Sequence, residues 1–168
     1  MPARLITPRL TLRAAVVDDA AALHAIFSDA RAMRYWSSLP HARLEQTLAW
    51  LDGMVGRPAN GHTDFLIEHH GRVIGKAGCW RPWEIGYLLD PAYWGRGLGR
   101  EAVAAVIDHI FRLGDTDAIV ADVDPRNHAS LHLLDALGFA ETGRAAATIR
   151  IGDELCDSVY LRLARPPE

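Results

Sequence analysis

The stretch that decides how this chain folds is residues 88–102, Leu88-Leu89-Asp90-Pro91-Ala92-Tyr93-Trp94-Gly95-Arg96-Gly97-Leu98-Gly99-Arg100-Glu101-Ala102. In it, an apolar strand end passes through a loop of alternating glycines into the start of a helix. The first N–H groups of a helix lack partners within the helix and lie at the positive end of its dipole, and glycines let an anion approach the backbone. Arg96 and Arg100 add positive charge. The stretch therefore predicts a phosphate-binding junction.

Different glycine loops can occupy such a junction. A Walker A loop requires G-x-x-x-x-G-K-[ST], which these residues do not match. A dinucleotide fingerprint requires G-x-G-x-x-G directly after a strand, whereas these glycines are spaced G-x-G-x-G and come after an insertion, residues 90–94. A glycine-rich turn without a ligand stays open when the loop is considered alone, because glycines also serve tight turns.

The rest of the chain predicts an α/β fold. Hydrophobic periodicity and turn residues indicate one strand, two helices, three strands, a helix, a strand, a helix and two strands. We expect strands near residues 9–13, 65–67, 73–74, 85–89, 118–123, 139–151 and 153–163, and helices near residues 44–55, 97–113 and 127–137. A further helix, the first in the chain, is capped by Asp18 or Asp19 and has apolar positions Ala22, Leu23, Ile26 and Phe27. In the second helix, Leu44, Leu48, Leu51 and Val55 form an apolar stripe. The pattern predicts a mixed central sheet of about seven strands with helices on both faces.

Composition limits the classes of function. The 168 residues are 49% hydrophobic and suit one core that needs neither metal nor disulfide. With 18 basic and 21 acidic residues the net charge is −3, so we expect no nucleic-acid partner, whereas a cationic amine is compatible. No apolar run reaches the ~18 residues of a membrane span and the first residues form no apolar signal core, so we expect no membrane partner and a cytoplasmic location.

Cysteine and histidine placement gives two further expectations. Cys79 and Cys156 stand far apart and form no C-x-x-C pair, so we expect two reduced thiols. His128 and His132 lie four residues apart, but no cysteine or third close ligand accompanies them. We therefore expect no metal site.

Residues 94–99 resemble the pyrophosphate loop of the GNAT N-acetyltransferase superfamily, Q/R-x-x-G-x-G/A, although Trp94 replaces the usual Gln or Arg. Further motifs resemble the branch of the ribosomal-protein alanine N-acetyltransferases, and these are Thr7-Pro8-Arg9-Leu10-Thr11-Leu12-Arg13, Glu84-Ile85-Gly86-Tyr87, Asn127-His128-Ala129-Ser130 and Leu137-Gly138-Phe139. The resemblance implies a single N-acetyltransferase domain over residues 1–168, with a core of about residues 5–163.

The resemblance also implies a co-substrate, acetyl-CoA, lying between two splayed parallel strands, here residues 85–89 and 118–123. The main chain of Leu88 and Leu89 would bind the pantetheine arm, and one of their N–H groups would face the thioester carbonyl. N–H groups of residues 96–100 would hold the pyrophosphate. The implied cofactor-binding residues are Leu88, Leu89, Trp94, Gly95, Arg96, Gly97, Leu98, Gly99, Arg100 and Asn127.

Direct transfer to an amine requires that a proton leaves the ammonium and that another reaches the departing thiolate. Many relatives place a tyrosine seven residues after the asparagine as general acid, but here that position is Leu134. The branch resemblance implies Ser130 instead, whose alternative role is an ordinary polar residue in a first helical turn. Glu84 is the candidate base, or else a solvated surface glutamate.

Tyr35 and Trp36 come after the first helix and are the candidate substrate-binding residues, since relatives use this segment for the acceptor. Packing under a connector is their alternative role. The expected function is acetyl-CoA-dependent transfer of an acetyl group to a primary amine, in first place a protein N-terminal α-amine. A small-molecule amine and a catalytically idle CoA-binding module remain alternatives. Monomer and homodimer both stay open.

Overall fold

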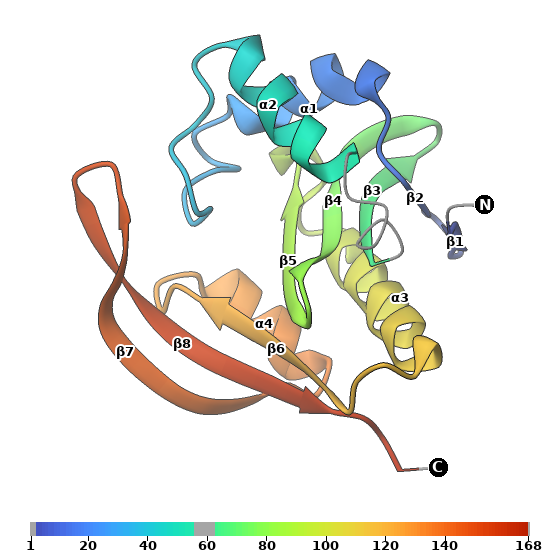
Figure 1. Cartoon of the computed structure of the whole chain (residues 1–168), viewed down its shortest axis with the longest axis vertical. Helices are drawn as coiled ribbons and strands as arrows, with labels where there is room; N and C mark the ends of the chain where they lie inside the picture. The colour runs from blue at the N-terminus through green and yellow to red at the C-terminus, as the bar shows by residue number, and fades with distance from the viewer. Residues whose placement is uncertain (1–2, 56–62, 168) are drawn as a thin grey trace.

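The computed structural model describes residues 3–55 and 63–167 (Figure 1). Its strands and α-helices are, in chain order, β1 (Leu5–Ile6), β2 (Thr11–Arg13), α1 (Ala20–Phe27), α2 (Leu44–Val55), β3 (Asp64–His69), β4 (Arg72–Arg81), β5 (Glu84–Leu89), α3 (Leu98–Leu113), β6 (Ala118–Val123), α4 (His128–Ala136), β7 (Ala140–Ile151) and β8 (Glu154–Ala164). Short 3₁₀ turns at Val17–Asp19 and Pro91–Tyr93 precede α1 and α3. None of the described helices is long and apolar enough to span a membrane.

The strands form one mixed sheet in the order β1-β2-β3-β4-β5-β6-β8-β7. The described residues therefore contribute eight strands rather than about seven. The additional strand is β1, which pairs antiparallel with β2 through Leu5 opposite Leu12. Its two residues are too few to show the period-two alternation by which a strand is recognised in sequence.

Helices cover both faces of the sheet, as the sequence predicts. The helices α1 and α2 share one core with Leu66, Val73 and Leu88, which are buried side chains of the central strands. The helix α3 and residues of α4 share the other core with the opposite faces of β2 to β6 and with β8. Alternation along the strands sends neighbours such as Val73 and Ile74 to different cores. The result is a sheet held between two helical layers.

The strands β5 and β6 separate along their length, and this opening positions the site (Figure 1). They run parallel, and among the described residues they pair at one position, Glu84 opposite Val120. A bond from the Val120 N–H to the Trp83 carbonyl, 2.9 Å, closes the same end. Beyond it, β5 stays on β4 and β6 stays on β8. The expected splayed strand pair is present, and its open end faces the glycine loop and α4.

Candidate active site

A cleft of about 860 Å³ runs from the open end of β5 over the glycine loop to α4. Nine of the ten cofactor-binding residues predicted from the sequence line it, and these are Leu88, Leu89, Trp94, Gly95, Gly97, Leu98, Gly99, Arg100 and Asn127. Arg96 is the exception, because its guanidinium lies over the Tyr93 ring at 5.4 Å from the ring centre. We call this cavity the donor cleft.

The glycine loop opens the N-terminus of α3 toward the donor cleft. Gly95 and Gly97 both adopt the left-handed conformation, with φ of 70° and 75°, which residues other than glycine rarely adopt. Gly97 is the N-cap of α3, so the unpaired N–H groups of the first helical turn come directly after it. The Trp94 indole N–H donates to the Leu89 carbonyl at 2.9 Å and ties the loop to the strand end. The backbone arrangement suits an anion.

The main chain of β5 alternates between its neighbour β4 and the opening. Leu88 lies opposite Lys76 of β4, and its carbonyl points so directly at that strand that a Cβ on Gly75 would meet it at 2.1 Å. The Leu89 carbonyl instead reaches the Trp94 indole, away from β4. Because N–H and C=O of one strand residue point to the same side, Leu89 and Tyr87 present their main chain to the opening. Leu88 therefore lines the cleft, but its main chain faces β4 and not the donor as expected.

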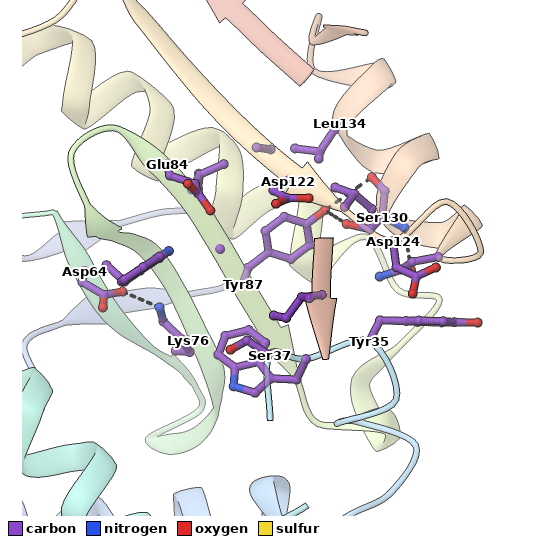
Figure 2. Close-up of a pocket in the computed structure, with 18 of the residues that line it drawn as sticks. Tyr35, Ser37, Asp64, Lys76, Glu84, Tyr87, Asp122, Asp124, Ser130 and Leu134 are labelled. Atoms are coloured by element: carbon purple, nitrogen blue, oxygen red, sulfur yellow. Dashed lines mark hydrogen bonds and ion pairs between the residues drawn. The ribbon is translucent and has the colours of Figure 1, made fainter. Parts of the chain in front are cut away.

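A second cavity of about 490 Å³ lies along the first part of β5, from Glu84 to Tyr87, and we call it the acceptor cavity (Figure 2). Its walls come from β4, β5 and β6, from the segment after α1, from α2, and from Ile149 near the end of β7. Among the described residues that line it, five are aromatic, and these are Tyr35, Trp36, Trp50, Trp80 and Tyr87. Tyr35 and Trp36, the candidate substrate-binding residues, line this cavity and the donor cleft as well.

The charges around the acceptor cavity are mostly negative. Its described lining residues include four carboxylates, Asp64, Glu84, Asp122 and Asp124, and one ammonium group, that of Lys76. The ammonium is buried and lies 2.7 Å from Asp64 (Figure 2). Such an arrangement favours a cation over an anion as the occupant.

The nearby guanidinium groups are also held by carboxylates. Arg126 lies 2.6 Å from Asp124 and forms a second ion pair with Glu154. Arg34 lies 3.5 Å from the same Glu154. At the edge of the cavity, two hydrogen bonds from Arg81 reach Oε2 of Glu84, at 2.9 Å and 2.5 Å. Both use one oxygen of Glu84, so Arg81 leaves the other, Oε1, to an amine or to water.

Two hydroxyl groups meet where the donor cleft and the acceptor cavity join. Tyr87 and Ser130 line both cavities, and their hydroxyl oxygens are hydrogen-bonded to each other (Figure 2). Burial raises the pKa of Tyr87 to about 12, although the bond to Ser130 lowers it in part. Tyr87 is therefore protonated at neutral pH and can donate. Asn127 caps α4, since its Oδ1 accepts from the Ser130 N–H at 3.2 Å, and this bond holds Ser130 in the first helical turn.

The cysteines lie apart from both cavities. Cys79 and Cys156 are free and buried, and neither occurs among the described residues that line the donor cleft or the acceptor cavity. Burial, and to a lesser extent Asp64, raises the pKa of the Cys79 thiol to about 12, so this thiol is not a ready nucleophile.

A family model described as the acetyltransferase (GNAT) domain matches residues 9–140 of this chain. The chain belongs to the GNAT acetyltransferase family. The L-methionine sulfoximine/L-methionine sulfone acetyltransferase of Salmonella typhimurium is 31% identical over 147 residues, which are 80% of this chain and 82% of that protein. The structure of YncA from Salmonella typhimurium, solved with its cofactor acetyl-CoA, matches with a TM-score of 0.72 and 26% identity over 95% of this chain and 98% of that one.

The fold also matches that of RimL, the ribosomal L7/L12 α-N-protein acetyltransferase, in complex with coenzyme A. The TM-score is 0.84 at 22% identity, covering 96% of this chain and 98% of RimL. The GNAT family and its fold are thereby confirmed, and the likeness to RimL is one of fold. This GNAT protein is an acetyl-CoA-dependent N-acetyltransferase, and so an enzyme rather than an idle CoA-binding module.

One residue of this GNAT site, Tyr87, has no role in the sequence-based prediction. It belongs to the quoted motif Glu84-Ile85-Gly86-Tyr87, but a motif does not tell which neighbour a side chain reaches. A usable signal was the absence of a phenol at Leu134, which is fully buried in the core. The missing phenol indicates that a tyrosine of a neighbouring strand could take its place, and Tyr87 of β5 is such a residue.

Proposed function

We propose that this enzyme acetylates a primary α-amine that carries no neighbouring free carboxylate, with a protein or peptide N-terminus as acceptor. The observation that supports the proposal is the charge of the acceptor cavity. An ammonium group would be drawn toward the carboxylate of Asp122 and toward Oε1 of Glu84, since Arg81 holds the other oxygen of Glu84. A carboxylate next to that amine would meet the same negative groups, because the Lys76 ammonium is already paired with Asp64. A peptide bond carries no such charge.

The relatives are compatible with an α-amine but differ in the molecule that carries it. RimL is named for the α-amine of a ribosomal protein, whereas the Salmonella relative is named for two amino-acid derivatives. The second candidate function, acetylation of a small-molecule amine, is favoured by the cavity volume of about 490 Å³, which is within the range of small-molecule sites.

On the donor side, acetyl-CoA supplies the acetyl group as a thioester. The N–H groups after Gly97 would bind the pyrophosphate, and the amide NH₂ of Asn127, which its capping bond leaves unused, would bind the pantetheine arm. The main-chain N–H groups of Tyr87 and Leu89 face the opening of the sheet. One of them would stabilise the negative charge that develops on the thioester oxygen.

On the acceptor side, two groups would move protons. Glu84 Oε1, directly or through a water molecule, would take a proton from the ammonium so that the nitrogen can attack. The Tyr87–Ser130 pair would return a proton to the departing thiolate. Either hydroxyl of this pair can donate to the other, and when Tyr87 donates, the hydroxyl proton of Ser130 is free to point into the cleft.

An acceptor panel tests the proposed function. The panel contains alanine, alaninamide, an alanine-terminated tripeptide, the same tripeptide with an acetylated N-terminus, and spermidine, with thiol release and product mass as readouts. We expect alaninamide and the free tripeptide to exceed alanine at least about tenfold in kcat/KM, because like charges at a site cost several kcal/mol. Preference for alanine would overturn the proposal, and preference for spermidine would favour the second candidate. The blocked tripeptide is the control.

A further inference from the structure

The N-terminal motif Thr7-Pro8-Arg9 contacts the glycine loop, although about ninety residues separate the two in sequence. The motif forms the turn between β1 and β2, where the Thr7 N–H donates to the Leu10 carbonyl at 3.0 Å. From this turn, the Arg9 side chain extends to the first turn of α3 and to the loop before it. The contact needs an explanation, because the proposed chemistry uses no residue of this motif.

Arg9 makes two side-chain contacts that together fix its guanidinium. Its Nε donates to Oε2 of Glu101 at 2.7 Å, and its Nη1 donates to the Arg96 carbonyl at 2.8 Å. Glu101 is held further by the Arg9 backbone N–H at 2.9 Å and by the Thr7 hydroxyl at 2.6 Å. The planar guanidinium of Arg9 thus links α3 to the glycine loop. A lysine ammonium would link them less well, because its donors are not held in a fixed plane.

The bond to the Arg96 carbonyl has a geometric consequence for the next residue. In a trans peptide, the C=O of one residue and the N–H of the following one point in opposite directions. The Arg96 carbonyl points toward Arg9, so the Gly97 N–H points away from Arg9. Gly97 lines the donor cleft. Arg9 therefore determines the direction of an N–H group at the proposed pyrophosphate site.

The ion pair has an electrostatic consequence. Glu101 lies in the first turn of α3, where a free carboxylate would repel a bound anion. Burial raises the pKa of Glu101, but hydrogen bonds from Thr7 and Arg9 lower it by more, so the carboxylate is ionised. Arg9 supplies the compensating charge and holds that carboxylate against the motif.

We propose that Arg9 is a positioning residue for the pyrophosphate of the donor, acting through the Arg96 carbonyl and the Glu101 carboxylate. The proposal rests on the proposed function of the glycine loop as the pyrophosphate site. It assigns the Thr7-Pro8-Arg9 motif to donor affinity and gives it no part in acetyl transfer itself.

The test compares two donors, acetyl-CoA and S-acetylpantetheine, which lacks the pyrophosphate and the nucleotide. Hydrogen bonds to charged groups are each worth enough to change affinity about tenfold. We expect Arg9→Gln to raise the KM for acetyl-CoA about tenfold, to leave kcat unchanged, and to leave kcat/KM for S-acetylpantetheine unchanged. Calorimetric titration with CoA should show the same loss of affinity. Arg9→Lys should show most of the same loss of affinity for acetyl-CoA, because one ammonium cannot serve both partners.

Arg144→Gln is the matched control, since Arg144 forms a similar pair with Glu141 at 2.6 Å on β7 and should alter neither donor. A partly unfolded variant would lose activity equally with both donors, and an equal loss would overturn the proposal for Arg9. Unchanged kinetics with both donors would overturn it too. If the unmodified enzyme shows no preference for acetyl-CoA over S-acetylpantetheine, the glycine loop itself is misassigned, which is a distinct result.

Discussion

A serine hydroxyl by itself is a weak acid, so the proposed role of Ser130 as proton donor depends on its contact with Tyr87. Leu134 leaves α4 without a phenol, and the Tyr87 phenol reaches the same region from β5. Tyr87 stays protonated because burial raises its pKa to about 12. A donated bond from Tyr87 stabilises negative charge on the Ser130 oxygen as its proton departs.

The first prediction concerns this pair. Tyr87→Phe and Ser130→Ala should each lower kcat about 100-fold, the usual range for a lost acid, while the KM for acetyl-CoA stays within about twofold. The double variant should be little worse than the more damaged single variant, because the two groups share one role. Tyr160→Phe, an exposed tyrosine of β8, is the control and should keep full activity. Independent, multiplying losses would contradict the shared role.

The sequence predicts residues of the site better than their contacts. The resemblance assigns Ser130 and Glu84 by position, and the structure places both on the lining of the acceptor cavity. It assigns Leu88 and Leu89 alike, whereas strand alternation turns the main chain of Leu88 to β4. The ion pair between Glu84 and Arg81 and the bond between Tyr87 and Ser130 depend on the folded arrangement, so no motif contains them.

At the scale of elements, α2 shows how a boundary can be predicted while the buried face is not. Its bounds, Leu44–Val55, are those expected, but Leu44, Leu48 and Val55 are 42%, 37% and 40% exposed. The buried side is Thr47 and Leu51. Thr47 tolerates burial because its hydroxyl lies 2.9 Å from His24 Nδ1 and 2.8 Å from His41 Nδ1. Counting apolar residues misassigned the face, since a satisfied polar residue occupies it.

The second prediction uses the two ends of α3. Gly97 begins the helix with φ of 75°, and Gly114 ends it with φ of 84°. Replacing either by alanine should lower the free energy of unfolding by about 1–2 kcal/mol, the cost of a left-handed L-residue. Only Gly97→Ala should also weaken CoA binding, because Gly97 shapes the anion site. Denaturant unfolding and calorimetric titration measure the two effects. Equal CoA affinity in both variants would contradict the assignment of the loop.

At the scale of the whole molecule, the separation of β5 from β6 creates two cavities that share one boundary. Five residues line both of them, and these are Tyr35, Trp36, Tyr87, Asn127 and Ser130. The fold class could be predicted from periodicity and resemblance. The common boundary could not, because it depends on the segment after α1, on β5 and on α4 meeting in space. Four acidic side chains are among the described residues that line the acceptor cavity, which periodicity does not show.

We propose that an amine in the acceptor cavity attacks the donor directly at this boundary. Initial rates measured while acetyl-CoA and the best acceptor of the panel are both varied test it most directly. Because both substrates must be bound together, double-reciprocal plots should give intersecting lines. Parallel lines, the mark of a covalent acetyl-enzyme formed before the amine binds, would contradict the account.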